Sequence, residues 1–344
     1  MDTNIWLMPK YYKDFKCKCE KCRHTCCSAW KIPVSEEEYF ALIGMDASLD
    51  LHNRIESSFV TPEFPTPEVY KYISFNWLGN CHLNVDGLCL LHKEQGESKL
   101  PKVCKLYPRS LKKINNQLIA NCSSSCERVV EMLFEDKEFE LVEDYLDEKP
   151  QIEINVDKEE VDNILKFNQI LKDKSKSLSD RIKDICLIVN PCEFNKEYNT
   201  DTNPLKESIN LLYRFSHSDN LLSEIYIKIN EKYKDNYNQY EKDKLVFETK
   251  FSNWEDFFSN VINNSLIYES FPFVDNRFDQ TDAFKGLCAC FGLLRLVCIG
   301  YTSIYSSKDD LIDAVSELFR LIEHTAFYYN VNVIVNNAAA LLKM

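Results

Sequence analysis

Ten of the fifteen cysteines lie within the first 130 residues, and this density constrains what that part of the chain can fold into. Five of them fall between Cys17 and Cys27, and the others are Cys81, Cys89, Cys104, Cys122 and Cys126. Thiolates are soft ligands that bind zinc, iron–sulfur clusters and Cu(I). An odd total fits poorly with a complete disulfide framework. We therefore expect a cysteine-rich module organised around a metal ion or cluster.

Local spacing brings some of these thiols together. Three residues separate Cys22 from Cys26, so one turn can direct both sulfurs at a common centre. Cys81 and Cys89 flank Asp86-Gly87, a turn dipeptide that folds the two thiols back toward each other. Zinc and a [4Fe–4S] cluster both accept all-cysteine ligand sets, so spacing leaves the choice between them open.

Other potential ligands have weaker patterns. The module's histidines are expected at the surface or beside the ligands; they are His24, His82 and His92. The later cysteines lie in apolar or loop contexts and are expected to bind no metal; they are Cys186, Cys192, Cys288, Cys290 and Cys298.

Composition narrows the classes of function. The net charge of −13 argues against nonspecific nucleic-acid binding. None of the seven glycines forms a GxGxxG or GxxxxGK pattern, so a glycine-rich nucleotide loop is excluded and a doubly wound α/β fold is disfavoured. Residues 1–16 lack an apolar signal region, which predicts a cytoplasmic protein. Residues 284–300 are apolar but contain Lys285 and Arg295, so we expect a buried helix and no membrane insertion.

Charge changes sign along residues 99–149. Six basic residues precede any acid; they are Lys99, Lys102, Lys105, Arg109, Lys112 and Lys113. Residues 131–149 are strongly acidic. Two interpretations remain open: two solvated faces of opposite charge, or a basic rim beside the metal site that meets an anionic cofactor or partner.

The pattern of the whole chain predicts a mainly α fold, in which a cysteine-rich metal-binding N-terminal module of short strands and loops packs on an α-helical C-terminal body. The expected domains are residues 1–130 and 131–344. Residues 30–34 have strand character, and Ser35 with Glu38 forms a capping box that begins a helix over 36–43. The three prolines in 59–70 and the turn-forming residues in 190–204 predict loops. From Val161 onward, apolar residues recur at helical spacing, and Ser307 is placed as the N-cap of a helix.

Several segments together resemble the flagellin lysine-N-methylase family and the related cysteine-cluster proteins that chelate zinc or iron. They are Tyr12–Cys17 with Cys22-x3-Cys26-Cys27-x2-Trp30, Cys81–Leu83 with Asp86–His92, Cys104-x2-Tyr107-Pro108-Arg109, Leu118–Cys126 and Leu321–His324. Cys19 and Cys122 are additional to the family pattern, and residues 101–103 replace its Cys-x-x before Cys104.

The resemblance implies transfer of a methyl group from S-adenosylmethionine to lysine side chains of flagellin, assisted by an iron–sulfur cluster or zinc. Its metal ligands would be Cys17, Cys22, Cys26, Cys27, Cys81, Cys89, Cys104 and Cys126. Candidate catalytic residues are Tyr107, Glu323 and His324, and candidate cofactor-binding residues are Arg109, Trp30 and Trp77. The alternatives are a noncatalytic metal-binding protein and an iron–sulfur electron carrier.

Overall fold

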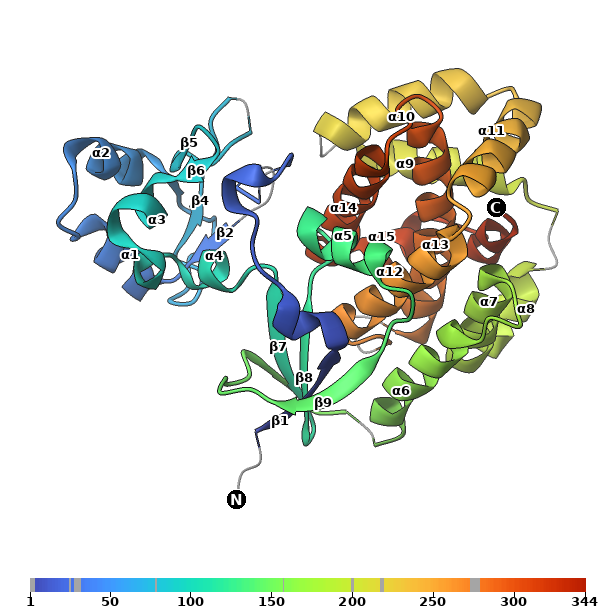
Figure 1. The fold of residues 1–344 in the computed structure, drawn as a ribbon, viewed down its shortest axis with the longest axis horizontal. Coiled ribbons are helices and arrows are strands. Elements are labelled where there is room, and N and C mark those ends of the chain that lie inside the picture. Colours follow the sequence, from blue (N-terminus) through green and yellow to red (C-terminus); the bar gives the residue numbers. More distant parts are fainter. Residues whose placement is uncertain are drawn as a thin grey trace. The chain divides into compact units, whose positions relative to one another are not determined.

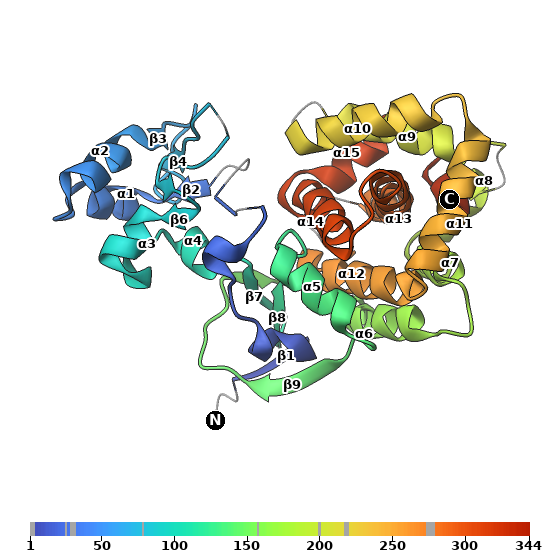
Figure 2. The same cartoon turned by 45° about the horizontal axis from the view of Figure 1, so that its top comes forward.

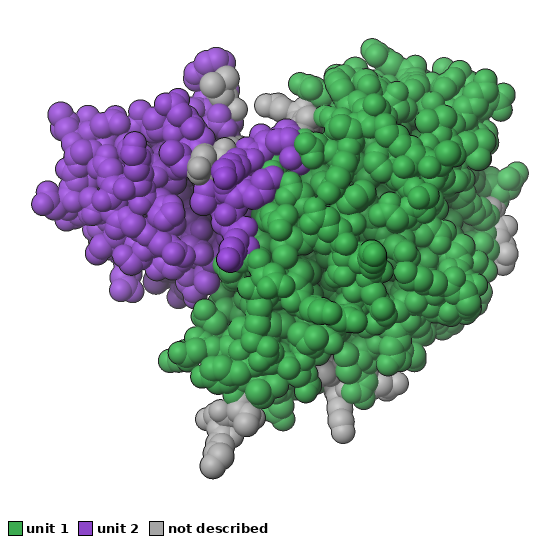
Figure 3. Space-filling model, viewed as in Figure 1, with its two compact units in different colours: residues 1–15, 108–344 green, residues 16–107 purple. Residues whose placement is uncertain are grey.

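The computed structural model describes residues 4–24, 26–27, 32–77, 79–156, 158–198, 201–216, 220–272 and 279–344. The chain forms two compact units, one of residues 16–107 and one of residues 1–15 with 108–344 (Figure 3). This division differs from the expected boundary at residue 130. Residues 108–130, which include Cys122 and Cys126, belong to the larger unit with the helices.

The smaller unit combines short strands with short helices around its own apolar core. Its strands are β2 (Ile32–Val34), β3 (Phe59–Val60), β4 (Lys71–Ile73), β5 (Asn84–Val85) and β6 (Leu88–Cys89). Its α-helices are α1 (Glu36–Ile43), α2 (Leu49–Ser57), α3 (Leu90–Gln95) and α4 (Lys102–Leu106). β2, β4 and β3 form one antiparallel sheet in that order, and β5 and β6 form a hairpin.

Local sequence signals in this unit are confirmed. Helix α1 begins at the predicted capping box, where Ser35 Oγ accepts from the Glu38 amide at 3.3 Å and Glu38 Oε2 accepts from the Ser35 amide at 2.8 Å. Asp86 and Gly87 both have positive φ, as a two-residue hairpin turn requires. The predicted loop over 59–70 is correct except at its start, where Phe59 pairs with Ile73 in the short strand β3.

The larger unit contains a mixed sheet of five strands in the order β10-β7-β8-β1-β9 (Figure 1). The strands are β1 (Ile5–Pro9), β7 (Arg109–Ile114), β8 (Gln117–Cys122), β9 (Leu141–Tyr145) and β10 (Ile152–Ile154). β1 runs parallel to β8 and antiparallel to β9, and β10 runs parallel to β7. The predicted α-helical body after residue 130 also contains the strands β9 and β10, which complete this sheet. The protein is mostly helical with mixed sheets.

The helices of the larger unit follow one another along the chain. They are α5 (Glu127–Glu135), α6 (Lys158–Lys172), α7 (Leu178–Val189), α8 (Pro191–Tyr198), α9 (Pro204–Phe215), α10 (Asn220–Tyr233), α11 (Tyr237–Lys250), α12 (Trp254–Glu269), α13 (Gln280–Thr302), α14 (Lys308–His324) and α15 (Phe327–Ile334). Ser307 caps α14 as predicted, and Asp310 completes the capping box. Figure 2 looks nearly along α13, which the other helices surround.

Helix α13 is the apolar centre of the larger unit. By length and composition alone it could cross a membrane, and 94% of its most apolar 18-residue window is buried inside the protein. Its Arg295 is buried, pairs with Glu248 and lies 4.0 Å from the Trp254 ring centroid. The charge is thus neutralised within the protein, as expected for a core helix.

Helix α8 corrects the prediction of a loop over residues 190–204. Pro191 occupies the first helical position, where a proline needs no amide hydrogen, and Asn190 Oδ1 accepts from the Glu193 amide at 3.2 Å. Phe194 is buried, and Glu197 pairs with Lys285 at 3.4 Å. Tertiary contacts therefore stabilise a helix in a segment whose composition is typical of turns.

Candidate functional site

A fully buried polar segment joins β8 to α5. Its residues are Asn121, Cys122, Ser123, Ser124 and Ser125. Asn264 of α12 fixes this segment by donating from Nδ2 to the Cys122 carbonyl at 2.9 Å and to Ser124 Oγ at 2.8 Å. Asn121 Nδ2 donates to the Asn264 carbonyl at 2.8 Å. Because buried polar groups must be satisfied, this network holds the segment in one conformation.

The last two residues of α14 reach the same segment. Ser123 Oγ donates to Glu323 Oε2 at 2.6 Å and lies 3.2 Å from His324 Nε2. Ser125 Oγ lies 2.5 Å from Ser123 Oγ and 2.8 Å from His324 Nε2. The structure thus brings together the predicted residues Glu323 and His324 and joins them through two serines.

Glu323 is buried, with only 8% of the residue exposed to solvent, and this burial is the main influence on its pKa. Desolvation raises the pKa of this carboxyl to about 7. The Ser123 hydroxyl, which donates to Oε2, and the nearby Ser265 hydroxyl and Ser124 and Ser125 amides favour the ionised form and oppose that rise in pKa. A carboxyl with a pKa near 7 is suited to exchange protons at neutral pH.

Lys112 and Glu269 interact electrostatically with this carboxyl. Lys112 of β7 donates from Nζ to the Tyr268 carbonyl and to Ser270 Oγ at 3.2 Å, and its Nζ lies 5.2 Å from the Tyr268 ring centroid. Burial lowers the pKa of Lys112, while the nearby Glu269 and Glu323 raise it. Burial raises the pKa of Glu269, and Lys112 opposes that rise. The sequence left two interpretations of the basic run open, a solvated face or a basic rim beside the metal site. Lys112 fits neither interpretation, because its ammonium lies inside the larger unit.

His324 is neutral at physiological pH. Burial lowers its pKa to about 4, with a smaller contribution from Arg320. Its ring packs edge-on against Tyr268 with centroids 6.1 Å apart. A neutral imidazole accepts a hydrogen bond at one nitrogen and donates at the other. His324 can therefore accept a proton at one ring nitrogen and release another proton from the other nitrogen, so the ring does not stay charged.

The other predicted site residues are not gathered at this point. Arg109 lies at the start of β7, where its guanidinium is 5.1 Å from the Phe15 ring centroid and donates to the Phe15 carbonyl at 3.3 Å. Tyr107 and Trp77 belong to the smaller unit, and Trp77 is 90% exposed. Trp30 lies outside the described residues. The roles predicted for these four residues stay predictions.

Sequence reasoning did not identify four polar residues that surround Glu323: Ser123, Ser125, Lys112 and Glu269. One signal was available for the serines, since three in succession lie between Cys122 and Cys126 just before an amphipathic helix. The positions of Lys112 and Glu269 depend on contacts between β7 and the end of α12, and no local sequence pattern predicts these contacts.

Four thiols lie together in the smaller unit. Cys81 is buried, and Cys27, Cys89 and Cys104 pack half-buried against the same apolar core. The Cys81 amide donates to the Cys27 carbonyl at 2.7 Å, and Cys81 Sγ accepts from the Leu83 amide at 3.4 Å. Cys89 sulfur also accepts from backbone amides, those of Leu91 and His92. Backbone donors directed at sulfur favour the thiolate form that binds metal.

The electrostatics of these thiols depend on one another. Burial raises the pKa of Cys81 to about 12 and also raises the pKa values of Cys89 and Cys104. Cys104 is within electrostatic reach of the other three, which add to the rise. Without a cation Cys81, Cys89 and Cys104 are therefore neutral, and a bound metal would deprotonate them. The donor set fits a thiophilic metal or cluster.

The described residues contain no group of three or more His, Cys, Asp or Glu side chains already in metal-binding geometry. Among the other predicted ligands, Cys17, Cys22 and Cys26 belong to the same smaller unit. Cys17 Sγ is 3.9 Å from Cys19 Sγ, and Cys126 belongs to the larger unit. The metal site therefore stays a prediction, with Cys27, Cys81, Cys89 and Cys104 as its best-supported ligands.

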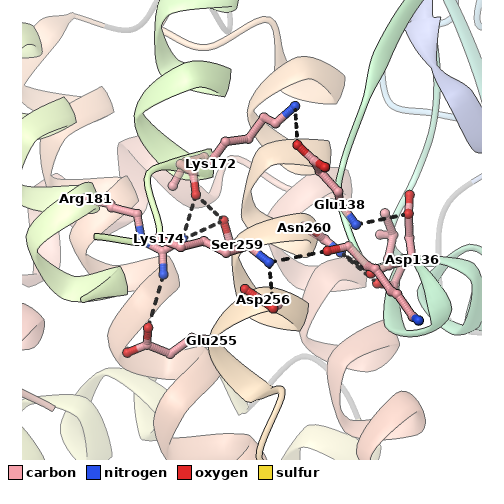
Figure 4. Close-up of polar contacts among 12 residues, drawn as sticks. Asp136, Glu138, Lys172, Lys174, Arg181, Glu255, Asp256, Ser259 and Asn260 are labelled. Atoms are coloured by element: carbon pink, nitrogen blue, oxygen red, sulfur yellow. Dashed lines mark hydrogen bonds and ion pairs between the residues drawn. The ribbon is translucent and has the colours of Figure 1, made fainter. Parts of the chain in front are cut away.

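A surface hollow in the larger unit is bounded by charged side chains (Figure 4). Lys172 pairs with Glu138 at 3.0 Å, and Lys174 pairs with Asp256 at 2.8 Å. Buried Arg181 donates to the Leu171 carbonyl at 2.6 Å and pairs with Glu255 at 3.1 Å. These pairs connect α6, α7 and α12 and already neutralise one another, so we interpret the hollow as a structural junction.

Comparison with known proteins places most of the larger unit in a known family. Residues 91–337 match the family model described as FliB lysine N-methylase C-terminal domain. The chain is also 26% identical over 139 residues to the Lysine-N-methylase of Salmonella choleraesuis (strain SC-B67), which covers 37% of this chain and 32% of that protein. The chain thus matches about a third of the length of this curated relative. No solved structure matches it.

Proposed function

The chain belongs to the FliB lysine N-methylase family, and from this premise we propose that it methylates lysine side chains of flagellin with S-adenosylmethionine as methyl donor. The family match includes β7, β8, α12 and α14, which carry the Glu323 cluster. The resemblance of the cysteine segments to flagellin lysine-N-methylases supports flagellin as the substrate. A cytoplasmic location fits a protein whose described cysteines form no disulfide.

The observation that carries the proposal is the buried carboxyl of Glu323. An amine must be neutral to attack a sulfonium methyl group, and removing the proton from a lysine at neutral pH costs about 4–5 kcal/mol because its ordinary pKa is about 10.4. Glu323, with a pKa of about 7, accepts that proton. The Ser123 hydroxyl, which donates to Oε2 at 2.6 Å, orients the carboxyl for this task.

The methyl donor is a co-substrate that supplies an electrophilic methyl group and leaves as S-adenosylhomocysteine. The chain has no glycine-rich nucleotide-binding loop, and we propose that side chains bind this molecule. Arg109 remains our candidate for its carboxylate.

For the cysteine module we propose that Cys27, Cys81, Cys89 and Cys104 hold zinc or an iron–sulfur cluster. Either group would be soft enough for four thiolates, and its binding would contribute directly to the folding free energy of the smaller unit. A polar methyl transfer requires no electron, so we assign the bound group a structural or substrate-positioning task. The hydrogen bonds at Cys81 and Cys89 support this assignment.

Labelled methyl transfer to purified, unmethylated flagellin tests the proposal. We expect label on flagellin lysines when the protein is purified without oxygen, and none on flagellin whose lysines have been acetylated beforehand. Glu323→Gln removes the proton acceptor while keeping the size of the side chain, so it should lower the rate by about 10²-fold or more. A folded, metal-replete protein that transfers no label would instead favour a noncatalytic metal-binding protein or an electron carrier.

A further inference from the structure

We propose that Ser123, Ser125 and His324 form a path that carries the proton away from Glu323 after each methyl transfer. The inference rests on the proposed function, since it concerns the same carboxyl. It assigns Ser123, Ser125 and His324 as positioning residues that act through Glu323. His324 was expected from sequence to act as a base or to contact the cofactor, and its place at the end of this path gives it a different task.

The geometry of the path is continuous. The distance from Glu323 Oε2 to Ser123 Oγ is 2.6 Å, and the distance from Ser123 Oγ to Ser125 Oγ is 2.5 Å. Ser125 Oγ lies 2.8 Å from His324 Nε2. A second branch joins Ser123 Oγ directly to His324 Nε2 at 3.2 Å. Each distance lies within the range of a hydrogen bond, and each hydroxyl is both donor and acceptor. Both branches end on His324, which is therefore the point where the path can be interrupted.

Burial makes such a path necessary. Glu323 and both serines are buried, whereas His324 is only partly buried. Methylation of a lysine ammonium forms the Nζ–C bond, breaks the S–C bond and releases one proton, which Glu323 receives. Glu323 must lose that proton before the next turnover. His324 takes up a proton at Nε2 and releases another from Nδ1 to solvent, and the hydroxyls then rotate back.

The charges around Glu323 decide how readily it gives up the proton. The titratable groups that face it come from the 3-10 helix η1 (Lys10–Asp14) and from β7, α12, α13 and α15. They are Tyr11, Lys112, Tyr268, Glu269, Cys290 and Tyr328. Lys112 is the basic side chain among these six, and its ammonium form favours the ionised carboxyl. The hydrogen-bonded path and the surrounding charges both affect the proton on Glu323, so variants must separate the effect of the path from the effect of the charges.

Two variants separate the transport of the proton along the path from the affinity of Glu323 for that proton. His324→Ala removes the end of both branches but leaves the Ser123 hydrogen bond to Glu323. It should lower the multiple-turnover rate at neutral pH by about tenfold or more, and added imidazole should restore the rate by entering the space of the lost ring. Ser123→Ala removes a hydrogen bond to the ionised carboxyl, so the rate–pH profile should move to higher pH, and Ser123→Thr should keep the wild-type profile.

The experiment measures rates for wild type, His324→Ala and His324→Phe with and without imidazole, at one pH and buffer. Phenylalanine fills the space without a nitrogen, so it should be slow and should not respond to imidazole. A rate that imidazole restores in His324→Ala but not in His324→Phe supports the path. Equal rates in all three proteins, or a loss in His324→Ala that imidazole leaves unchanged while helix content is normal, would overturn it. Wild-type protein without any methyl transfer would instead refute the proposed function itself.

Discussion

The unusual pKa of Glu323 has a consequence for stability that can be measured without any substrate. The pKa rises from 4.5 to about 7 on folding, so ionising this carboxyl inside the protein costs about 3 kcal/mol more than ionising it in the unfolded chain. Below pH 4.5 the group is protonated in both states and stability is unaffected. As pH rises from 4.5 toward 7, the unfolded chain releases the proton first, and the folded protein loses stability.

Glu323→Gln removes this titration and keeps a polar side chain of the same size. The free energy of unfolding of the variant, minus that of wild type, should therefore increase by about 3 kcal/mol between about pH 4 and pH 8. His324 titrates with the opposite sign, since its pKa falls on folding, and it is present in both proteins.

Urea unfolding followed by far-ultraviolet circular dichroism at several pH values measures this difference, because the larger unit carries most of the helices. Glu143→Gln is the matched control, since Glu143 is an exposed residue on β9 of the same unit. A Glu323→Gln difference that stays flat over this range would show that the carboxyl titrates normally, and the argument for its role as proton acceptor would fail.

Three other predictions concern separate parts of the molecule. Lys112→Met should raise the pKa of Glu323 and move the rate–pH profile to higher pH, whereas Lys113→Met, which removes a partly exposed ion pair with Glu153, should leave the profile unchanged. Gly286→Ala should destabilise the protein by about 1–3 kcal/mol in thermal unfolding, because its new Cβ would lie 2.0 Å from Tyr328 Cδ1; an unchanged melting temperature would contradict the packing of α13 on α15. Cys104→Ala should abolish metal binding in elemental analysis, whereas Cys288→Ala, in the core of α13, should retain the metal; equal metal content in both would refute the proposed ligand set.

Local signals in the sequence predicted local structure well. The Ser35–Glu38 capping box, the Asp86-Gly87 turn and the Ser307 N-cap each depend on residues a few positions apart, and each is present. The five-stranded sheet was not predicted, because β1 pairs with β8 and β9 across more than a hundred residues. Helix α8 was missed because its stability comes from burial of Phe194 and from pairing of Glu197 with Lys285.

The candidate site was predictable only in part. The resemblance of Leu321–His324 to a family element singled out Glu323 and His324, and both reach the buried serines. The partners that define their chemistry come from β7, α12 and the segment after β8, which lie between about 50 and 210 residues away in the chain. The aromatic and arginine candidates were chosen for proximity to the cysteines in sequence, and proximity in sequence did not gather them at Glu323.

The pH dependence of single-turnover methyl transfer tests the central claim most directly, which is that Glu323 accepts the proton of the substrate lysine. The rate should rise with pH through a midpoint near 7 and then level off, and this midpoint should coincide with the pKa obtained independently from the stability difference between wild type and Glu323→Gln. A rate that shows no midpoint where Glu323 titrates, or a Glu323→Gln variant that retains the wild-type profile, would contradict the account.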